Sequence, residues 1–525
     1  MKRVIYINCC GDPWFKVAEK LNEKYGYKPV YWIGSPTEDP TLQVIHDHFP
    51  DVIFHNSIDA WKGRFPKVIQ DKAPYYYLDV DFLKRHAHHE LQAIKMMDRM
   101  DQDLRSFNFM ERQRHFRNML KQWMAGLDVI KPDLVISQDI PHRLYDYCLF
   151  WLCIEKGIPF ITFNHTPFTG RFFLAKNYFY TIGDRFIDDW HKFETNQNLI
   201  GSLTEDIKKR FDCLKQDYAT AIPAYMVKQK EQQKKANSFW FLTKRLVRKF
   251  CTVYRPYLKG QPAPPTIISH CAYSKNAKNK YEDSEGNIYQ HERMILYANR
   301  YRGQLKKAYD SLTTTPDYNE PYVVYFLHYQ PEQTTCPSGD IFVDQRLCVE
   351  LLLKYLPPNY KVYVKEHPSQ FNRYLIGHSG RMRDMYDDLV KNSRVKLVSV
   401  EEDSFKLIQY SKAVCTVTGT VGWEALVRQK PVIVFGVCWY ENYNKGVLRI
   451  TDEDSAKKMI QFIEHYHYNE QSLLAYLLSV SKNTTKAYYL LNMSKKEVGL
   501  SEGECVNNIV DAIAKELNLD KNILC

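Results

Sequence analysis

Long apolar runs, regularly spaced cysteines and a leader-like start are all missing from this 525-residue sequence. Without about 18 consecutive apolar residues, no membrane-spanning helix is predicted. The N-terminal residues become polar too early to form the apolar part of a signal peptide. The 13 cysteines follow no repeated metal-binding or disulfide spacing. We therefore expect a cytoplasmic protein whose thiols are reduced.

Acidic residues are scarce in one segment, which carries most of the net charge of +11. Residues 228–259 contain ten Lys or Arg against the single Glu231. Apolar residues recur there at helical spacing, at Phe239, Leu242, Leu246 and Phe250. This pattern predicts a basic amphipathic helix, either lying peripherally on an anionic membrane or packing its apolar side on its own protein. Because the rest of the chain is nearly neutral, nucleic acid is not an expected partner.

The first half alternates short apolar runs with helical stretches, which predicts a parallel sheet. The expected strands are residues 4–8, 29–33, 52–54, 134–137 and 159–163. A polar stretch at about 82–127, with little Gly or Pro, predicts a helical insertion between the early strands and the strand at 134–137.

A second alternation begins near Pro321 and predicts a second doubly wound sheet. Its expected strands are residues 322–327, 361–364, 395–398, 413–417 and 432–435. The predicted domains are a first Rossmann-like domain at 1–225, a basic and linker region at 226–320, a second at 321–485, and C-terminal helices at 486–525 that pack back.

Two loops of the second domain have the composition of a phosphate site. Lys365, Glu366, His367 and Pro368 follow a strand directly, where open α/β sheets bind ligands. About fifty residues later, Thr418, Gly419, Thr420 and Gly422 join a strand to a helix and expose backbone N–H groups and hydroxyls. The alternative is that both glycines serve only a tight turn.

Three further positions border the same predicted site. Glu424, one turn into the helix, is placed to accept hydrogen bonds from sugar hydroxyls. Gln330, Glu332 and Thr334 follow the first strand of this domain and are predicted ligand contacts. A capped turn without ligand contacts explains the last three residues equally well.

These motifs, continued by the strand and loop at 430–436, resemble the donor half of bacterial capsular polysaccharide biosynthesis proteins, a family similar to the Kdo transferases. The resemblance extends over residues 322–440. It implies a GT-B fold, with two Rossmann-like domains facing a cleft, and a nucleotide-sugar donor such as CMP-Kdo as substrate, without cofactor or metal. It also implies that His367 and Pro368 contact the nucleotide. Polyglycerol-phosphate polymerases share His-Pro but have a Ser-rich loop where this chain has Thr418-Gly419-Thr420, which favours sugar transfer.

Sugar transfer with inversion needs a general base for the acceptor hydroxyl. Our candidates follow strands of the first domain and are, in order, Asp139, His165 and Asp12. Each is equally explained as a turn former or helix cap. Arg143 and Arg171 are placed to pair with an anionic sugar or lipid phosphate, or serve at the surface.

Two motifs that look like metal sites are discounted. Asp79-Val80-Asp81 and the His-rich run 86–90 open the polar insertion, where solvated side chains are common, and no further ligand follows at suitable spacing.

Three functions remain open from sequence. The first is a glycosyltransferase that moves Kdo or a related acidic sugar onto a glycan or lipid-linked acceptor, with a UDP-sugar donor as the variant. The second is a nucleotide-sugar epimerase of the same fold, and the third is a non-catalytic, membrane-docked assembly protein.

Overall fold

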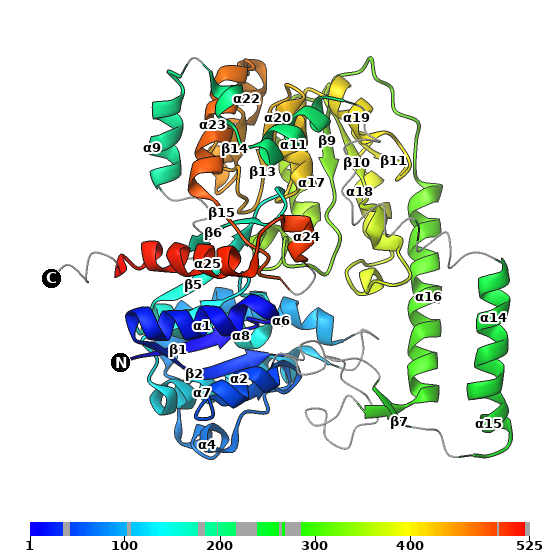
Figure 1. Ribbon diagram of the computed structural model, residues 1–525. Coiled ribbons are helices and arrows are strands. Elements are labelled where there is room, and N and C mark those ends of the chain that lie inside the picture. The colour runs from blue at the N-terminus through cyan, green and yellow to red at the C-terminus, as the bar shows by residue number, and fades with distance from the viewer. Residues whose placement is uncertain are drawn as a thin grey trace. The chain divides into compact units, whose positions relative to one another are not determined.

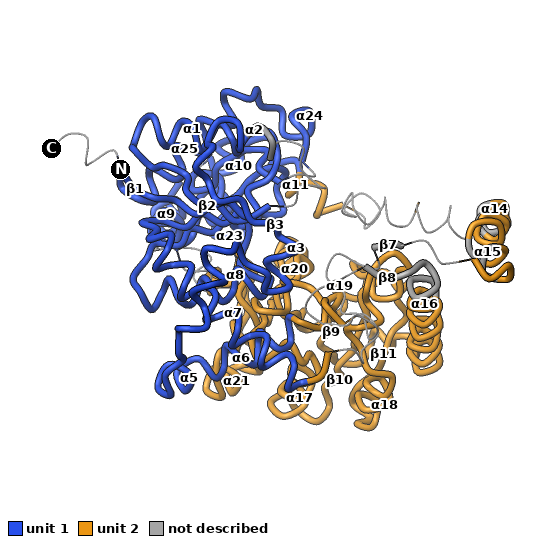
Figure 2. The backbone as a smooth tube through the Cα atoms, turned by 90° about the horizontal axis from the view of Figure 1, so that it is seen from below, with its two compact units in different colours: residues 1–96, 109–209, 469–525 blue, residues 97–108, 210–468 orange. Residues whose placement is uncertain are grey.

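The computed structural model describes residues 1–34, 42–101, 107–176, 184–196, 198–216, 231, 239–261, 265–267, 285–490 and 493–519. The predicted basic segment 228–259 lies partly outside these residues. The described chain forms two compact units (Figure 2). Unit 1 contains residues 1–96, 109–209 and 469–525, and unit 2 contains residues 97–108 and 210–468.

Unit 1 is built on a seven-stranded sheet in the order β15-β6-β5-β4-β1-β2-β3. The strands are β1 (Lys2–Ile7), β2 (Tyr27–Gly34), β3 (Ile53–Asn56), β4 (Leu134–Ser137), β5 (Phe160–His165), β6 (Arg171–Ala175) and β15 (Thr485–Lys486). The first five strands are parallel, whereas β6 runs antiparallel to both β5 and β15. All five strands expected in the first half are present.

The helices of unit 1 lie between its strands and in its C-terminal segment. They are α1 (Asp12–Tyr25), α2 (Leu42–His48), α3 (Ser57–Trp61), α4 (Lys67–Gln70), η1 (Ala73–Tyr75), α5 (Val80–Arg85), α6 (Ala87–Met96), α7 (Phe109–Ile130), α8 (Leu144–Glu155), α9 (Asp184–Phe193), α10 (Leu199–Ser202), α11 (Glu205–Lys215, which continues into unit 2), α23 (Glu470–Asn483), α24 (Lys495–Val498) and α25 (Glu502–Glu516).

The C-terminal helix α25 lies beside α1 (Figure 1). Its apolar face, with Val506, Ile509 and Ile513, is buried in the same cluster as Trp14 of α1. An ion pair of 2.8 Å between Lys16 and Glu502 joins the two helices at the surface. The apolar spacing of this helix therefore reflects packing on unit 1.

The stretch expected as a helical insertion includes α6 and most of α7. Phe116, Met119 and Trp123 of α7 are buried, and the ring of Trp123 meets the edge of Tyr31 from β2. Helix α7, the last helix before β4, is thus a core helix rather than an outer addition to the fold.

Unit 2 carries a six-stranded, fully parallel sheet in the order β11-β10-β9-β12-β13-β14. Its strands are β9 (Tyr322–Phe326), β10 (Lys361–Lys365), β11 (Val395–Val398), β12 (Ala413–Thr416), β13 (Val432–Val434) and β14 (Val447–Arg449). Numbered along the chain, this is the 3-2-1-4-5-6 order of a Rossmann fold. Near-continuous runs of buried Val, Ile and Tyr explain why these segments form a sheet covered on both faces.

The helices of unit 2 include several from residues 226–320, the region expected to be a linker. They are η2 (Met97–Met100), α14 (Phe239–Lys249), η3 (Phe250–Tyr254), α15 (Arg255–Leu258), α16 (Ile288–Ser311), η4 (Asp340–Val343), α17 (Gln345–Tyr355), η5 (Pro368–Phe371), η6 (Gly377–Ser379), α18 (Met385–Val390), α19 (Ser404–Tyr410), α20 (Thr420–Val427), α21 (Glu453–Lys457) and α22 (Met459–Glu464). Strands β7 (Pro265–Ile267) and β8 (Glu285–Asn287) form a small separate pair. Leu305 and Tyr309 of α16 are fully buried in the unit 2 core, so a boundary at residue 320 does not separate α16 from this unit.

Both units thus have a doubly wound sheet, because unit 1 also contains the order β3-β2-β1-β4-β5. The predicted α/β class is confirmed, and two Rossmann-like units are the composition of a GT-B fold. Among the described helices, none has the length and apolar character needed to cross a bilayer.

Candidate functional site

A pocket of about 220 Å³ lies at the carboxyl ends of the central strands of unit 2. Strands β9, β10 and β12 end there in Phe326, Lys365 and Thr416, and all three residues line the pocket. The order of strands reverses between β9 and β12, and this switch point is where open α/β sheets bind ligands.

Most of the predicted donor residues line this pocket. They are Glu332, Thr334, Lys365, Glu366, His367, Pro368, Thr418, Gly419, Thr420 and Glu424. Gln330 and Gly422 are absent from the lining, which also includes residues that the sequence analysis did not select, such as His328, Tyr329 and Ser404.

The His367 imidazole is held as a neutral hydrogen-bond donor. Its Nδ1 accepts a 3.1 Å hydrogen bond from the backbone N–H of Ser369, so Nε2 carries the proton. The pKa of His367 is lowered to about 4, mainly by burial; Glu366 opposes this shift, and the nearby Arg381 and Lys365 add to it. A neutral Nε2–H is suited to donating to a phosphate or carbonyl oxygen.

His328 joins the loop after β9 to the loop after β12. Its Nε2 accepts a 3.0 Å hydrogen bond from the backbone N–H of Thr418. Burial, followed by the neighbouring His367 and Arg381, lowers the pKa of His328 to about 3, so it too is neutral at pH 7. The position of His328 directly after the first predicted strand of the domain could have marked it as a site residue. Its hydrogen-bond partner, Thr418, could not be found from sequence because it lies 90 residues away.

Glu366 and Lys365 are bound to their own protein. The Glu366 carboxylate pairs with Arg381, with 2.9 Å between Oε2 and Nε, and accepts a 2.7 Å hydrogen bond from the Tyr386 hydroxyl. The Lys365 ammonium donates to the Ser404 hydroxyl at 2.8 Å. Their side chains therefore hold the loop that carries His367, which differs from the direct ligand contact expected from sequence.

The N-terminus of α20 faces the pocket without a side-chain cap. Gly419 is the N-cap residue, and no side chain caps the first N–H groups of the helix. The Thr418 hydroxyl donates to the backbone oxygen of Thr334 at 2.8 Å, which joins the two loops. Uncapped N–H groups and the helix dipole make such a terminus suitable for an anion.

Gly422 has a packing role. A Cβ atom at this position would lie 2.2 Å from the Tyr440 hydroxyl oxygen. That hydroxyl donates to the backbone oxygen of Gly419 and thereby holds the loop before α20. The absence of a side chain at Gly422 lets Tyr440 reach this carbonyl.

Glu424 lies one turn into α20 and its residue is only 8% exposed. Burial raises the pKa of Glu424 to about 7, although the positive charges of Arg210 and Arg428 oppose the shift. Arg210 Nη2 lies 3.9 Å from Glu424 Oε1. A carboxyl group that titrates near neutrality fits a hydrogen-bonding partner for sugar hydroxyls.

Some residues of the loop after β9 line the pocket, and others hold the loop in place. Glu332 and Thr334 line the pocket, and the Thr334 hydroxyl donates to Glu332 Oε2 at 3.0 Å. The Gln330 side chain instead donates to the backbone oxygen of Val343 at 2.6 Å, and its backbone N–H donates to Gln370. Gln330 is therefore a loop-stabilising residue and its prediction as a donor contact is not supported by its position.

Within unit 1, two base candidates lie together. His165 Nε2 is 3.5 Å from Asp139 Oδ1, and His165 Nδ1 is hydrogen-bonded to the Tyr489 hydroxyl. Burial alone would raise the pKa of Asp139, but nearby His142 and His165 outweigh this effect and hold it well below its usual range. Asp139 is therefore ionised at neutral pH.

Tyr489 comes from the C-terminal segment that returns to unit 1. Its backbone oxygen accepts a 2.8 Å hydrogen bond from the Trp14 indole and a second bond from the Gln138 amide. These contacts fix Tyr489 against the loop that carries Asp139. Sequence reasoning missed it because 324 residues separate Tyr489 from His165.

The other unit 1 candidates have different surroundings. Asp12 is exposed and is the first residue of α1. Arg143 precedes α8, where its Nη1 lies 3.7 Å from Asp146. The Arg171 guanidinium is buried and pairs with Asp206 at 2.6 Å, so it stabilises the unit and is not placed to bind a ligand.

The motifs that resemble metal sites have local partners. Asp79 caps α5 by accepting from the N–H of Phe82 at 2.5 Å. His86 contacts His89 and Glu155, both at 2.9 Å, and the His89 ring stacks on Trp151. In the described part of the chain, no three His, Cys, Asp or Glu side chains are grouped so that they could hold a metal ion.

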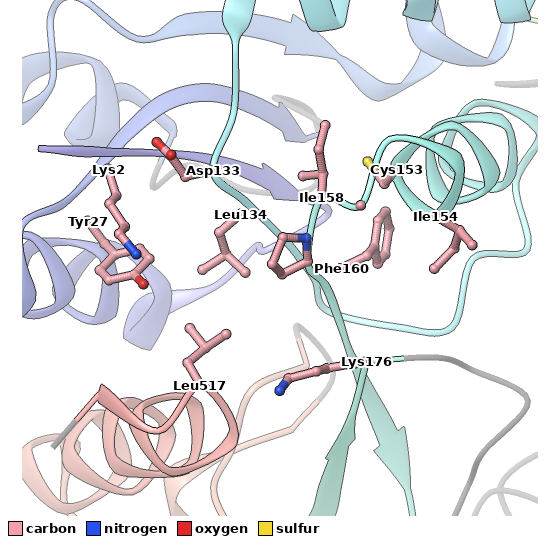
Figure 3. Close-up of a pocket in the computed structure, with 12 residues that line it drawn as sticks. Lys2, Tyr27, Asp133, Leu134, Cys153, Ile154, Ile158, Phe160, Lys176 and Leu517 are labelled. Atoms are coloured by element: carbon pink, nitrogen blue, oxygen red, sulfur yellow. The ribbon is translucent and has the colours of Figure 1, made fainter. Parts of the chain in front are cut away.

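Unit 1 has a pocket of about 410 Å³ at the opposite, amino ends of its strands (Figure 3). Lys2, Tyr27 and Leu134 line it where β1, β2 and β4 begin, and Lys176 and Leu517 close another side. None of the predicted site residues lines this pocket. The carboxyl ends of the unit 1 strands, with Asp139 and His165, are the candidate chemical site of this unit.

Several solved structures are similar at low identity. UDP-GlcNAc 2-epimerase of Methanocaldococcus jannaschii, in complex with UDP-GlcNAc and UDP, is 11% identical with a TM-score of 0.23, covering 89% of this chain and 94% of that chain. KpsC of Thermosulfurimonas dismutans matches as its beta Kdo 2,7 transferase, at 16% identity and a TM-score of 0.23, covering 43% of this chain and 67% of that chain. Its beta Kdo 2,4 transferase matches at 12% identity and a TM-score of 0.28, covering 72% and 87%.

The family comparison concerns unit 2. No curated protein matches the chain. Residues 281–476 match the model of the family described as Capsule polysaccharide biosynthesis protein. This range contains every strand of the unit 2 sheet and every residue that lines its pocket. The resemblance to capsule polysaccharide biosynthesis proteins is thus confirmed, and residues 281–476 are the part of the chain that matches this family's model.

Proposed function

We propose that this protein is a glycosyltransferase of capsule or surface polysaccharide synthesis that uses a nucleotide-activated sugar. The observation that supports this most directly is the unit 2 pocket, where a neutral His367 and the uncapped N-terminus of α20 lie at the switch point of a Rossmann sheet. Hydrogen-bond donors without full charges, gathered at a helix terminus, suit a diphosphate or phosphodiester group.

The assigned roles follow from these contacts. The His367 Nε2–H and the N–H groups of α20 bind the phosphate, and Glu424 accepts hydrogen bonds from hydroxyls of the ribose or sugar. Arg381, Glu366 and His328 hold the loops in place. A CMP donor with Kdo or a related acidic sugar is our choice because of the family resemblance, and a UDP-sugar is the alternative.

The chemical step is a substitution at the anomeric carbon. An acceptor hydroxyl on a glycan or lipid-linked glycan forms the new glycosidic bond, the bond from the anomeric carbon to the phosphate oxygen breaks, and the nucleotide leaves with the electron pair. We propose Asp139 as the acceptor of the hydroxyl proton, oriented by His165. Asp139 is ionised at neutral pH, as a general base must be before it takes a proton, and the contacts with His142 and His165 that lower its pKa also reduce its basicity.

Calorimetry with purified protein tests the donor site. CMP, CMP-Kdo, UDP and CDP-glycerol are titrated into wild type, His367→Ala and His467→Ala, the last being an exposed histidine of unit 2 outside the pocket. We expect CMP to bind wild type and His467→Ala equally and His367→Ala about tenfold or more weakly, as for loss of a hydrogen bond to a charged group.

Three other results of these experiments would contradict parts of the proposal. Binding of UDP in place of CMP would overturn the CMP assignment, and no nucleotide binding at all would overturn the donor site. Turnover of a nucleotide sugar to its epimer without acceptor would show that the enzyme is an epimerase.

A further inference from the structure

The continuous helical segment α14-η3-α15 exposes both large apolar and basic side chains. Its described and exposed members that are apolar, aromatic or basic form what we call the basic helix surface: Trp240, Lys244, Leu246, Val247, Arg248, Phe250, Tyr254, Arg255, Leu258 and Lys259. We infer that this surface binds the face of an anionic phospholipid bilayer. This inference goes beyond the proposed sugar transfer and does not depend on it.

The apolar side chains of the basic helix surface are largely exposed to solvent. Trp240 is 83% exposed, Leu258 75%, Leu246 65% and Val247 64%. Large apolar side chains gathered at one exposed place mark a binding surface when charged residues border them. Here the border consists of lysine and arginine.

Spacing along α14 separates the two kinds of residue. At about 100° per residue, Trp240 and Val247 lie about 20° apart, and Leu246 and Phe250 complete an arc of about 120°. On the same projection, Lys244 and Arg248 lie about 40° and 80° beyond Trp240, outside this arc. The helix thus has an apolar side and a basic side, as helices that lie in a membrane interface do.

The sign of the charge identifies the bilayer as anionic. Residues 232–259 contain no Asp or Glu and eight Lys or Arg. Such a segment is attracted to the negative surface potential of anionic lipids. A nucleic acid would use only the basic side and leave Trp240, Leu246 and Val247 in water, whereas a bilayer takes up both sides at once.

The two-sided helix also predicts how deeply each kind of side chain enters the bilayer. Apolar side chains of an interfacial helix reach the boundary of headgroups and acyl chains, while Lys and Arg stay among the headgroups. Trp240 is therefore expected to contact acyl chains, and Lys244 and Arg248 to contact lipid phosphates.

Vesicle sedimentation with the full chain tests the inference. We would compare vesicles of phosphatidylcholine alone with vesicles containing phosphatidylglycerol, at low and high salt. Wild type should bind only the anionic vesicles, and less at high salt. The double variant Lys244→Glu/Arg248→Glu should bind about tenfold or more weakly. The matched control Lys457→Glu/Lys458→Glu makes the same charge change at exposed unit 2 positions and should bind as wild type.

Fluorescence quenching tests how deeply Trp240 enters the bilayer. Lipids brominated in the acyl chain should quench the fluorescence of wild type, and Trp240→Phe should lose most of this quenching while its thermal unfolding is unchanged. Equal binding to neutral vesicles, equal binding by the charge-reversed variant, or binding to duplex DNA without binding to vesicles would each overturn the inference. Nucleotide binding in the same samples reports on the donor pocket separately.

Discussion

Arg381 and Glu366 form an ion pair in unit 2 in which both side chains are fully buried. The Arg381 guanidinium also donates to the backbone oxygen of His328 at 2.6 Å. One guanidinium therefore ties the loop after β9 to the loop after β10, and these loops carry His328 and His367.

Removal of one partner should be far more damaging than removal of both. Arg381→Met leaves the Glu366 carboxylate buried without its cation, and should lower the free energy of unfolding by about 3–5 kcal/mol. The double variant Glu366→Gln/Arg381→Met should recover part of this loss, and Lys391→Met, which breaks an exposed pair with Asp388, should change little. Urea denaturation measures all three, and an equal loss in the single and double variants would contradict the model of an uncompensated charge.

Gly422→Ala should disturb the loop before α20. The added Cβ would lie 2.2 Å from the Tyr440 hydroxyl, so we expect a loss of about 1–3 kcal/mol in the free energy of unfolding and weaker nucleotide binding. Gly303→Ala is the matched control, because Gly303 is also helical and nothing lies within 4 Å of its added Cβ. That control should be neutral or stabilising by about 0.5–1 kcal/mol. If both alanine variants behave alike, the contact with Tyr440 is not the cause.

Nucleotide affinity should change with pH near neutrality. Burial raises the pKa of Glu424 to about 7, so its carboxylate form increases between pH 6 and pH 8. Because the carboxylate is the better acceptor for hydroxyl groups, affinity should rise over this range. Glu424→Gln should bind a CMP-sugar, whose phosphodiester does not titrate in this range, with an affinity that no longer changes with pH. Calorimetry at several pH values checks this, and an affinity that falls with pH in wild type would count against the assigned role.

Asp139→Asn should lower kcat by about 10²–10⁴-fold, the range for loss of a general base, with nucleotide binding unchanged. Asp12→Asn should have a small effect, since Asp12 is exposed at the start of α1. Tyr489→Phe removes the hydroxyl bonded to His165 and should lower kcat less than Asp139→Asn. Turnover of a CMP-sugar with and without acceptor measures these effects. A larger loss in Asp12→Asn than in Asp139→Asn would reverse our ranking.

The free energy of unfolding should fall as pH drops from about 6.5 to 4. Burial lowers the pKa of both His55 and His115 to about 4, whereas an unfolded histidine titrates near 6.5. Between these values the unfolded chain binds more protons, so acid favours unfolding, and above pH 6.5 this effect vanishes. Urea titrations at pH 7.5, 6 and 5 test the slope. His115→Gln should reduce it and the exposed His467→Gln should not.

The central strands of both units were predictable because their residues are buried on both faces and form apolar runs. Strand β15 was not, because it has two residues and pairs with β6 more than 300 positions earlier. The pocket loops were predictable because their composition reflects their position after strands. Arg381 follows a short 3-10 turn with no sequence signal, and its role depends on Glu366 and His328 in loops that only the fold brings near.

Residues 469–525 complete unit 1 after the whole of unit 2 has passed in sequence. During synthesis on the ribosome, unit 2 can therefore assemble from one nearly continuous stretch while the first 209 residues still lack α25 and Tyr489. The part of α1 that packs on α25 therefore stays uncovered in nascent chains through this interval. A stop codon late in the gene would thus release a chain with an assembled unit 2 pocket and an unfinished unit 1.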